Sequence, residues 1–285
     1  MIHIIDTFDQ VQSLLSGASF DLEKWKNYIN SIYEDASQFF LDDMQEMISG
    51  DYTFEKDFLP VILAVHDHPR LSELYRSFQT VTDRLNERVL NTFGRELDIE
   101  IVLYLGLCNG AGWVTALNGK NVILLGMEKI LELGWEDLDS MYGLIYHELG
   151  HVYHKQYGKF EGPVNEKGAP FIWQLFTEGI AMAFEQTLVG SPDYYHQDKN
   201  GWKDWCKSNF ATILSDFRSD LPTMTRTTQR YFGDWVSYQG YGDVGYYLGG
   251  RWIRFLLENH ALAELVTWEY PRIEEAFLAF TRAQL

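Results

Sequence analysis

The stretch EIVLYLGLCNGAGWVTALNGKNVILLG, residues 100–126, decides the fold class of this chain. It contains three short runs rich in branched and aromatic residues, separated by glycine and asparagine turns, which is the pattern of β-strands. Asn118-Gly119 stands between the last two runs and predicts a tight hairpin. The segment therefore predicts a small antiparallel or mixed sheet. Its runs cover 100–107, 112–117 and 121–126.

On both sides of this segment, the apolar residues recur with the period of a helix instead. Residues 20–93 repeat apolar side chains every three to four positions. Further helices are expected near 135–156, 169–188, 201–215, 243–259 and 271–283. The predicted fold is α+β and mostly α, with the sheet beside a long helix and helical parts on either side. We expect three parts: an N-terminal helical region over 1–97, a core of sheet and long helix over 98–160, and a C-terminal helical part over 161–285.

Composition limits the classes of partner. The 285 residues carry a formal net charge of −18, which disfavours nucleic acid and anionic lipid surfaces. No run reaches the roughly 18 apolar residues of a membrane span, and the N-terminus lacks a basic segment followed by a long apolar run. We therefore expect a cytoplasmic protein with no membrane partner. Cys108 and Cys206 form no CxxC pair and are expected to be small buried hydrophobes.

Within the helix near 135–156 lies the sequence His147-Glu148-x-x-His151. A helix brings side chains at i and i+4 to one face, where two imidazoles can bind one zinc ion. Leu149 and Val152 fall on the opposite stripe, which can face a core. Glu148 lies about 100° around the axis from His147, where a carboxylate can take a proton from a water on the metal. Two ordinary surface histidines are the alternative interpretation.

A catalytic zinc site needs a third protein ligand and an open position for water. Glu178, 27 residues after His151, is the candidate, and Glu185 on the same predicted helix is its rival. That helix is apolar on nearly every side, so a carboxylate buried there needs a partner such as a cation. His154 shares the face of His147, but the two are separated by about 10 Å of helix rise. We expect His154 to support the site or to lie on the helix surface.

Two loops rich in Gly, Pro, Asn and Asp, at 157–170 and 189–200, are candidate rims of a cleft. Simple connectors between helices explain the same composition. Residues 109–117 are a candidate sheet edge, which would offer unpaired backbone groups to an extended peptide. A plain core hairpin is the alternative.

The sequences HELGH and TEGIA (177–181) resemble the gluzincin metallopeptidases, and TEGIA is similar to the NEGFA-type segment of their aminopeptidase branch. The chain looks most like the predicted zinc-dependent proteases of bacterial cytoplasm. The resemblance covers about residues 99–257. It implies that Glu178 is the third zinc ligand and that the sheet edge lies beside the HExxH helix. It also implies that Tyr246, in the Y-x-x-G segment at 246–249, stabilises the oxyanion, although another tyrosine could serve.

Two departures from that family matter. Gluzincins often carry an acidic residue four positions after the ligand glutamate, where this chain has Met182, so Thr177 or another group would have to steady the ligand histidine. The glutamate that grips the substrate amine in the aminopeptidase branch has no counterpart in CNGAGWVTAL (108–117). The sequence thus predicts one Zn²⁺ ion and hydrolysis of a peptide or protein substrate, without aminopeptidase specificity. There are two alternatives. One is a zinc hydrolase of a non-peptide substrate, and the other is a non-catalytic binding or regulatory module in which zinc holds helices together.

Overall fold

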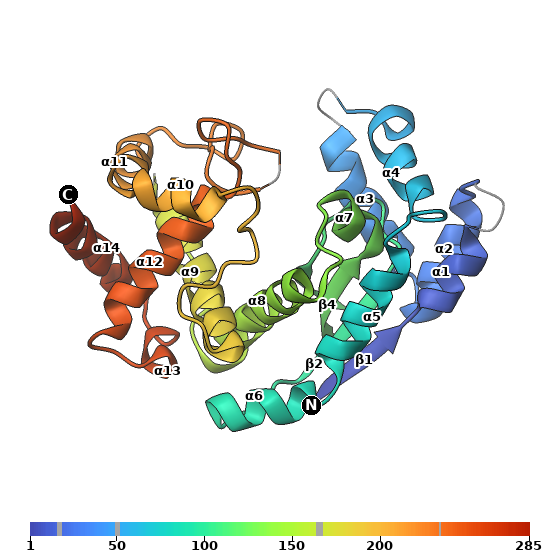
Figure 1. The fold of residues 1–285 in the computed structure, drawn as a ribbon, viewed down its shortest axis with the longest axis horizontal. Coiled ribbons are helices and arrows are strands. Elements are labelled where there is room, and N and C mark those ends of the chain that lie inside the picture. Colours follow the sequence, from blue (N-terminus) through green and yellow to red (C-terminus); the bar gives the residue numbers. More distant parts are fainter. Residues whose placement is uncertain (16–18, 49–51, 164–167, 234) are drawn as a thin grey trace. The chain divides into compact units, whose positions relative to one another are not determined.

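The computed structural model describes residues 1–15, 19–48, 52–163, 168–233 and 235–285 (Figure 1). They form two compact units, Met1–Glu148 and Leu149–Leu285. The boundary falls inside one continuous helix, α8 (Leu138–Tyr157). The predicted fold class is confirmed, because the described residues are mostly helical and carry one small mixed sheet. The division into three parts at residues 97 and 160 stays a prediction.

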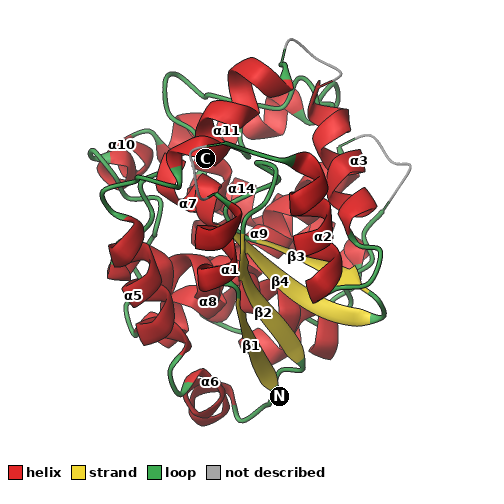
Figure 2. Cartoon of the chain, turned by 90° about the vertical axis from the view of Figure 1, so that its right-hand side faces the viewer, coloured by secondary structure: helices red, strands yellow, loops and turns green. Residues whose placement is uncertain are grey.

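The sheet belongs to the first unit and has the order β1-β2-β4-β3 (Figure 2). β1 pairs with β2 and β2 with β4 in parallel, whereas β3 and β4 form an antiparallel hairpin. Asn118 and Gly119 join the hairpin with φ angles of 50° and 76°, the left-handed conformations that a two-residue turn of this kind requires. The predicted hairpin is confirmed, and β3 is an outer strand. The strands are β1 (Ile2–Asp6), β2 (Ile99–Tyr104), β3 (Trp113–Leu117) and β4 (Lys120–Gly126).

β1 is absent from the sequence prediction, which describes residues 1–97 as helical. Ile2 is buried, but His3 and Ile4 are exposed, so only a weak alternation marks this strand. Its pairing starts at Ile2 with Ile99, a residue 97 positions away. A pattern of five residues cannot reveal such a distant partner.

Helices surround the sheet within the first unit and bury both of its faces. Val102, Tyr104 and Leu124 line the same small void as Ile29 and Ile32 from α2, so α2 covers one face. The alternate positions on the inner strands are also fully buried: Ile101, Leu103, Ile123 and Leu125. The predicted helical character of residues 20–93 is confirmed. Besides the start of α8, the helices are α1 (Phe8–Leu14), α2 (Leu22–Ile32), α3 (Ser37–Ile48), a one-turn π-helix η1 (Phe54–Phe58), α4 (Leu59–Ala64), α5 (Leu71–Thr82), α6 (Leu85–Phe93) and α7 (Met127–Glu132).

The second unit is built around α9 (Ala169–Val189), which packs closely against α12 (Val244–Leu257). A β-carbon on Gly179 would lie 2.5 Å from the carbonyl oxygen of Gly249, so only glycine allows the two backbones to approach this closely. Although α9 is apolar on almost every side, no helix in the described part of the chain is both long and apolar enough to cross a membrane. The remaining helices are α10 (Trp202–Ser208), α11 (Phe210–Asp220), α13 (Leu262–Leu265) and α14 (Tyr270–Gln284).

Both cysteines are buried, as predicted. Burial raises the pKa of the Cys206 thiol to about 12, so this side chain stays protonated near neutral pH. Cys108 has a φ of 63° in the loop that leads from β2 toward β3. Its backbone N–H donates to the buried carboxylate of Glu128. Cys206 therefore behaves as a small packing residue.

Candidate metal centre

Helix α8 presents His147 and His151 one turn apart. The helix starts after Asp137, whose carboxylate accepts hydrogen bonds from the backbone N–H and the hydroxyl of Ser140 at 2.9 and 2.7 Å. This capping satisfies a backbone donor that the first turn leaves without a helical partner. Leu149 and Val152 on the opposite stripe are buried, as the sequence predicts. His147, on the other side of the helix, is also buried, with 4% of its surface exposed.

Glu178 on α9 lies beside these histidines. One of its carboxylate oxygens is 3.3 Å from Nε2 of His151, and both side chains are 14% exposed. One ligand atom each from His147, His151 and Glu178 lie within 4.8 Å of one another. The structure thus brings the three predicted metal ligands together.

The donor set fits a zinc ion. Zinc prefers imidazole nitrogens and carboxylate oxygens at about 2.0–2.2 Å in a tetrahedral arrangement. Two ligands of one tetrahedral ion are then separated by about 3.3–3.5 Å, which matches the 3.3 Å between His151 and Glu178. His151 and Glu178 are therefore spaced as ligands of a common cation would be.

A close helix crossing sets this spacing. Gly150 lies inside the HExxH sequence, and a β-carbon at this position would come within 2.6 Å of the Cα atom of Ala181 on α9. It would also lie 3.1 Å from Cβ of Phe184. The two helices approach each other so closely because both positions are small. The crossing brings Glu178, three residues before Ala181, to the ligand face of α8.

Glu148 lies beside the residue that precedes the outer strand β3. Its side chain is buried, with 7% of its surface exposed. A β-carbon on Gly112 would meet Cγ and Oε1 of Glu148 at 3.2 and 3.4 Å and Cδ1 of Leu144 at 2.8 Å. The start of β3 and the predicted general base are thus neighbours. The expected sheet edge beside the HExxH helix is present, whereas its use by a peptide stays a prediction.

Tyr246 is half-buried in the first turn of α12. Its ring packs edge-on against Phe232, with 5.9 Å between the ring centroids. It lies three residues before Gly249, which contacts α9 at Gly179, the neighbour of Glu178. Tyr246 therefore belongs to the helix that packs on the ligand-bearing helix, and its role at an oxyanion stays a prediction.

His154 is fully buried, so its predicted position on the helix surface is wrong. Its ring lies among Phe160, Trp173 and Phe176 at centroid distances of 5.2–5.9 Å. Burial, and then the positive charge of His151, lower the pKa of His154 to about 4, which keeps the ring neutral. Neither ligand cluster found among the described residues includes it. Its ring therefore packs among aromatic side chains, and a role in supporting the site stays a prediction.

A second cluster uses the rival glutamate and a histidine that the sequence analysis misses. One ligand atom each from His147, Glu185 and His196 also lie within 4.8 Å of one another, and all three residues are buried. His196 belongs to the loop at 189–200 that we singled out for its composition. A single histidine in an irregular segment has no periodicity that could mark it. Thr177, the other suggested support, donates its hydroxyl to the carbonyl of Gln174 at 3.0 Å in its own helix.

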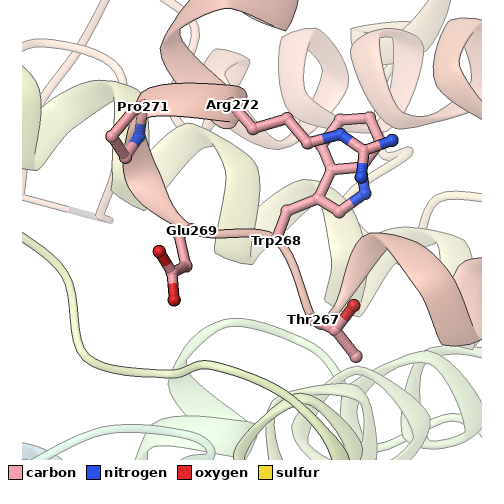
Figure 3. Close-up of a pocket in the computed structure, with 5 residues that line it drawn as sticks. All are labelled: Thr267, Trp268, Glu269, Pro271 and Arg272. Carbon is pink, nitrogen blue, oxygen red and sulfur yellow. The ribbon is translucent and has the colours of Figure 1, made fainter.

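The other loop singled out, at 157–170, includes residues 164–167, which lie outside the described residues. A hollow with a volume of about 310 Å³ is formed elsewhere in the second unit, before and at the start of α14 (Figure 3). The guanidinium carbon of Arg272 lies 3.9 Å from the centre of the Trp268 ring there. None of the candidate ligands lines this hollow. Its lining residues are Thr267, Trp268, Glu269, Pro271 and Arg272.

The chain matches no model of a known protein family, none of the curated proteins and no solved structure. The functional assignment therefore rests on the residues and on their geometry.

Proposed function

We propose that the protein is a zinc-dependent peptidase whose ion is held by His147, His151 and Glu178. The observation that carries the proposal is the 3.3 Å separation of His151 and Glu178 within a cluster that also contains His147. Glu178 is a better candidate than Glu185 for the third ligand, because its side chain is more exposed to solvent. A catalytic zinc keeps one position open for water or substrate. Glu178 and His151 are partly exposed, whereas Glu185 has no exposed surface.

Zinc held by His147, His151 and Glu178 would supply a Lewis acid that makes water more acidic and polarises the carbonyl of the substrate. The carboxylate of Glu148 is the proposed general base. It accepts the proton of the attacking water and passes it to the nitrogen of the leaving amine. Its side chain is buried beside Gly112, with 7% of its surface exposed. The hydroxyl of Tyr246 is the proposed donor to the oxyanion.

The outer strand β3 supports a peptide as the substrate. Among the residues that the structure describes, β3 pairs along one edge, with β4, and Gly112 at its start lies beside Glu148. An extended peptide added along the other edge would gain backbone hydrogen bonds and would run past the proposed base. The protein charge of −18 makes nucleic acid an unfavourable substrate. A cytoplasmic location is part of the same proposal.

Zinc content and peptide digestion test the function. The purified protein should contain one zinc per chain, and it should cleave members of a peptide library, read by mass spectrometry. Absence of bound zinc at neutral pH would overturn the metal site. Bound zinc with no cleaved peptide, but with hydrolysis of small ester or amide substrates, would favour a non-peptide hydrolase. Bound zinc with no hydrolysis of any substrate would favour a structural site.

A further inference from the structure

Glu185 and His196 form a buried pair in the second unit. Nδ1 of His196 lies 3.1 Å from each carboxylate oxygen of Glu185, and the backbone nitrogen of His196 lies 3.4 Å from Oε1. The Glu185 side chain has no exposed surface, and that of His196 is 4% exposed. A carboxylate removed from water is costly unless donors surround it. We therefore assign the Nδ1 proton of His196 to this hydrogen bond, which both oxygens share.

His147 forms a cluster of possible ligand atoms with this pair. Glu185 follows Glu178 by seven residues, two turns of α9, and so lies on nearly the same face. His147 precedes His151 by one turn of α8. His151 contacts Glu178, and the helices cross at Gly150 and Ala181. One ligand atom each from His147, Glu185 and His196 lie within 4.8 Å of one another.

A neutral imidazole has one donor nitrogen and one acceptor nitrogen, and only the acceptor can bind a metal. His147 belongs to both clusters. An outer carboxylate that accepts the N–H of a ligand histidine fixes which nitrogen carries the proton and how the ring is turned. The two oxygens of a carboxylate offer about four acceptor sites, so a carboxylate can accept from more than one donor.

We propose that Glu185, held in place by His196, is a positioning residue for His147. Its carboxylate accepts the proton-bearing nitrogen of His147 and leaves the other nitrogen free to bind the metal. This inference rests on the proposed function, since it assumes that His147 is a ligand. The cluster is a poor catalytic metal site, because Glu185 has no exposed surface and a catalytic zinc keeps a position open for water.

Metal affinity of the folded protein tests the proposal. Glu185→Gln keeps the size of the side chain but removes the charge, and His196→Asn removes the ring behind it. Zinc affinity would be measured by competition with a chromophoric chelator, and the visible absorption of the Co²⁺-substituted protein would report ligand geometry. Both variants should bind zinc about 10- to 100-fold more weakly and should shift the Co²⁺ bands. Gln186→Ala is the matched control, because it removes a 3.0 Å tether to the carbonyl of Tyr194 in the same loop without touching the carboxylate.

A coupling measurement separates positioning from a purely structural role. In a His147→Gln background, Glu185→Gln should have no further effect on zinc affinity, because the residue it orients is gone. Unchanged zinc affinity and Co²⁺ spectra in Glu185→Gln, with only a lower melting temperature, would overturn the positioning role and leave the proposed function intact. Two zinc ions per wild-type chain, one of them lost in His196→Asn, would show a second metal site instead. Normal zinc binding by the wild type without hydrolysis would remove the proposed function but not the positioning role.

Discussion

Gly150 and Ala181 place the backbones of α8 and α9 in contact, since a β-carbon on Gly150 would lie only 2.6 Å from the Cα atom of Ala181. The contact occurs one residue before His151 and three residues after Glu178. Helix packing and ligand spacing therefore depend on the same crossing. A change in the packing at Gly150 must move the candidate ligands relative to each other.

Gly150→Ala should destabilise the protein although alanine is the better helix former. The gain in helix propensity is about 1 kcal/mol, while the new methyl group forces apart two backbones that cannot move independently. We expect a net loss of about 1–3 kcal/mol in the free energy of unfolding. Asn91→Ala, at an exposed position of α6, is the control for propensity alone and should not destabilise. Chemical denaturation of both variants checks this, and a Gly150→Ala protein more stable than the wild type would contradict the crossing.

Gly112→Ala should impair hydrolysis and spare zinc binding. The added carbon would lie 3.2 Å from Cγ of Glu148 and 2.8 Å from Cδ1 of Leu144, so both side chains must shift. A displaced general base should lower kcat, while His147 and His151 keep their positions. Gly110→Ala is the matched control in the same loop, because its nearest neighbour would be 3.7 Å away. Equal kcat values for the two variants would show that Glu148 does not depend on this contact.

Glu148→Gln should retain one zinc per chain and lose at least about 10²-fold in kcat, because an amide cannot accept the proton of the attacking water. Zinc analysis and peptide hydrolysis on the same preparation provide the two readouts. Glu258→Gln, at an exposed position after α12, is the control and should change neither. Full activity of Glu148→Gln would transfer the role of base to another residue.

Glu178→Ala should weaken zinc binding more than the roughly 10- to 100-fold expected for Glu185→Gln, because it removes a ligand rather than the support of one. The measurement is zinc competition at neutral pH. Circular dichroism of the metal-free proteins should show equal helix content for both variants. The reverse ranking of the two affinities would make Glu185 the ligand.

Glu128 predicts a pH dependence of stability in the first unit. Burial raises the pKa of this carboxyl from its ordinary value of 4.5 to about 7, although the backbone N–H groups of Gly106 and Cys108 donate to it and Lys129 lies nearby. The folded state therefore binds the proton more tightly than the unfolded state. Its contribution to stability is complete below about pH 4.5 and is lost as the pH rises toward 7, by about 3 kcal/mol in total.

Glu128→Gln removes this titration. The stability of the variant relative to the wild type should therefore increase by about 3 kcal/mol between about pH 4.5 and pH 7. The loss of one backbone hydrogen bond adds a penalty that does not depend on pH. Glu132→Gln, on the same helix α7 but exposed, should show no such change. Denaturation at a series of pH values checks this, and a constant difference would show that Glu128 is ionised throughout.

The sequence predicted those parts of the fold that local patterns determine. α8 and α9 lie within three residues of their expected bounds, because an apolar period, the Asp137 cap and the left-handed Gly190 mark them. Asn118-Gly119 marks the hairpin in the same way. β1 was not predicted, because it is stabilised by pairing with β2, a distant strand that the local pattern does not indicate.

The candidate ligands were predictable for a similar reason, since HExxH places two histidines by helix geometry alone. Glu178 and Glu185 were both visible as carboxylates on an apolar helix, but their different exposure became known only from the packing. His196 reaches its place through the course of a loop, which no residue spacing encodes. Tyr246 is located on α12, and its chemical role awaits measurement.

The parallel register of β1 with β2, which starts with Ile2 beside Ile99, also has a consequence for folding order. Parallel pairing over such a sequence separation closes a long loop, so it raises contact order and slows the step that forms it. On a ribosome, β1 has no partner until residues beyond 100 have emerged. β1 therefore joins the sheet only after β2 has been synthesised, and until then its apolar side chains are accessible to chaperones or to other nascent chains.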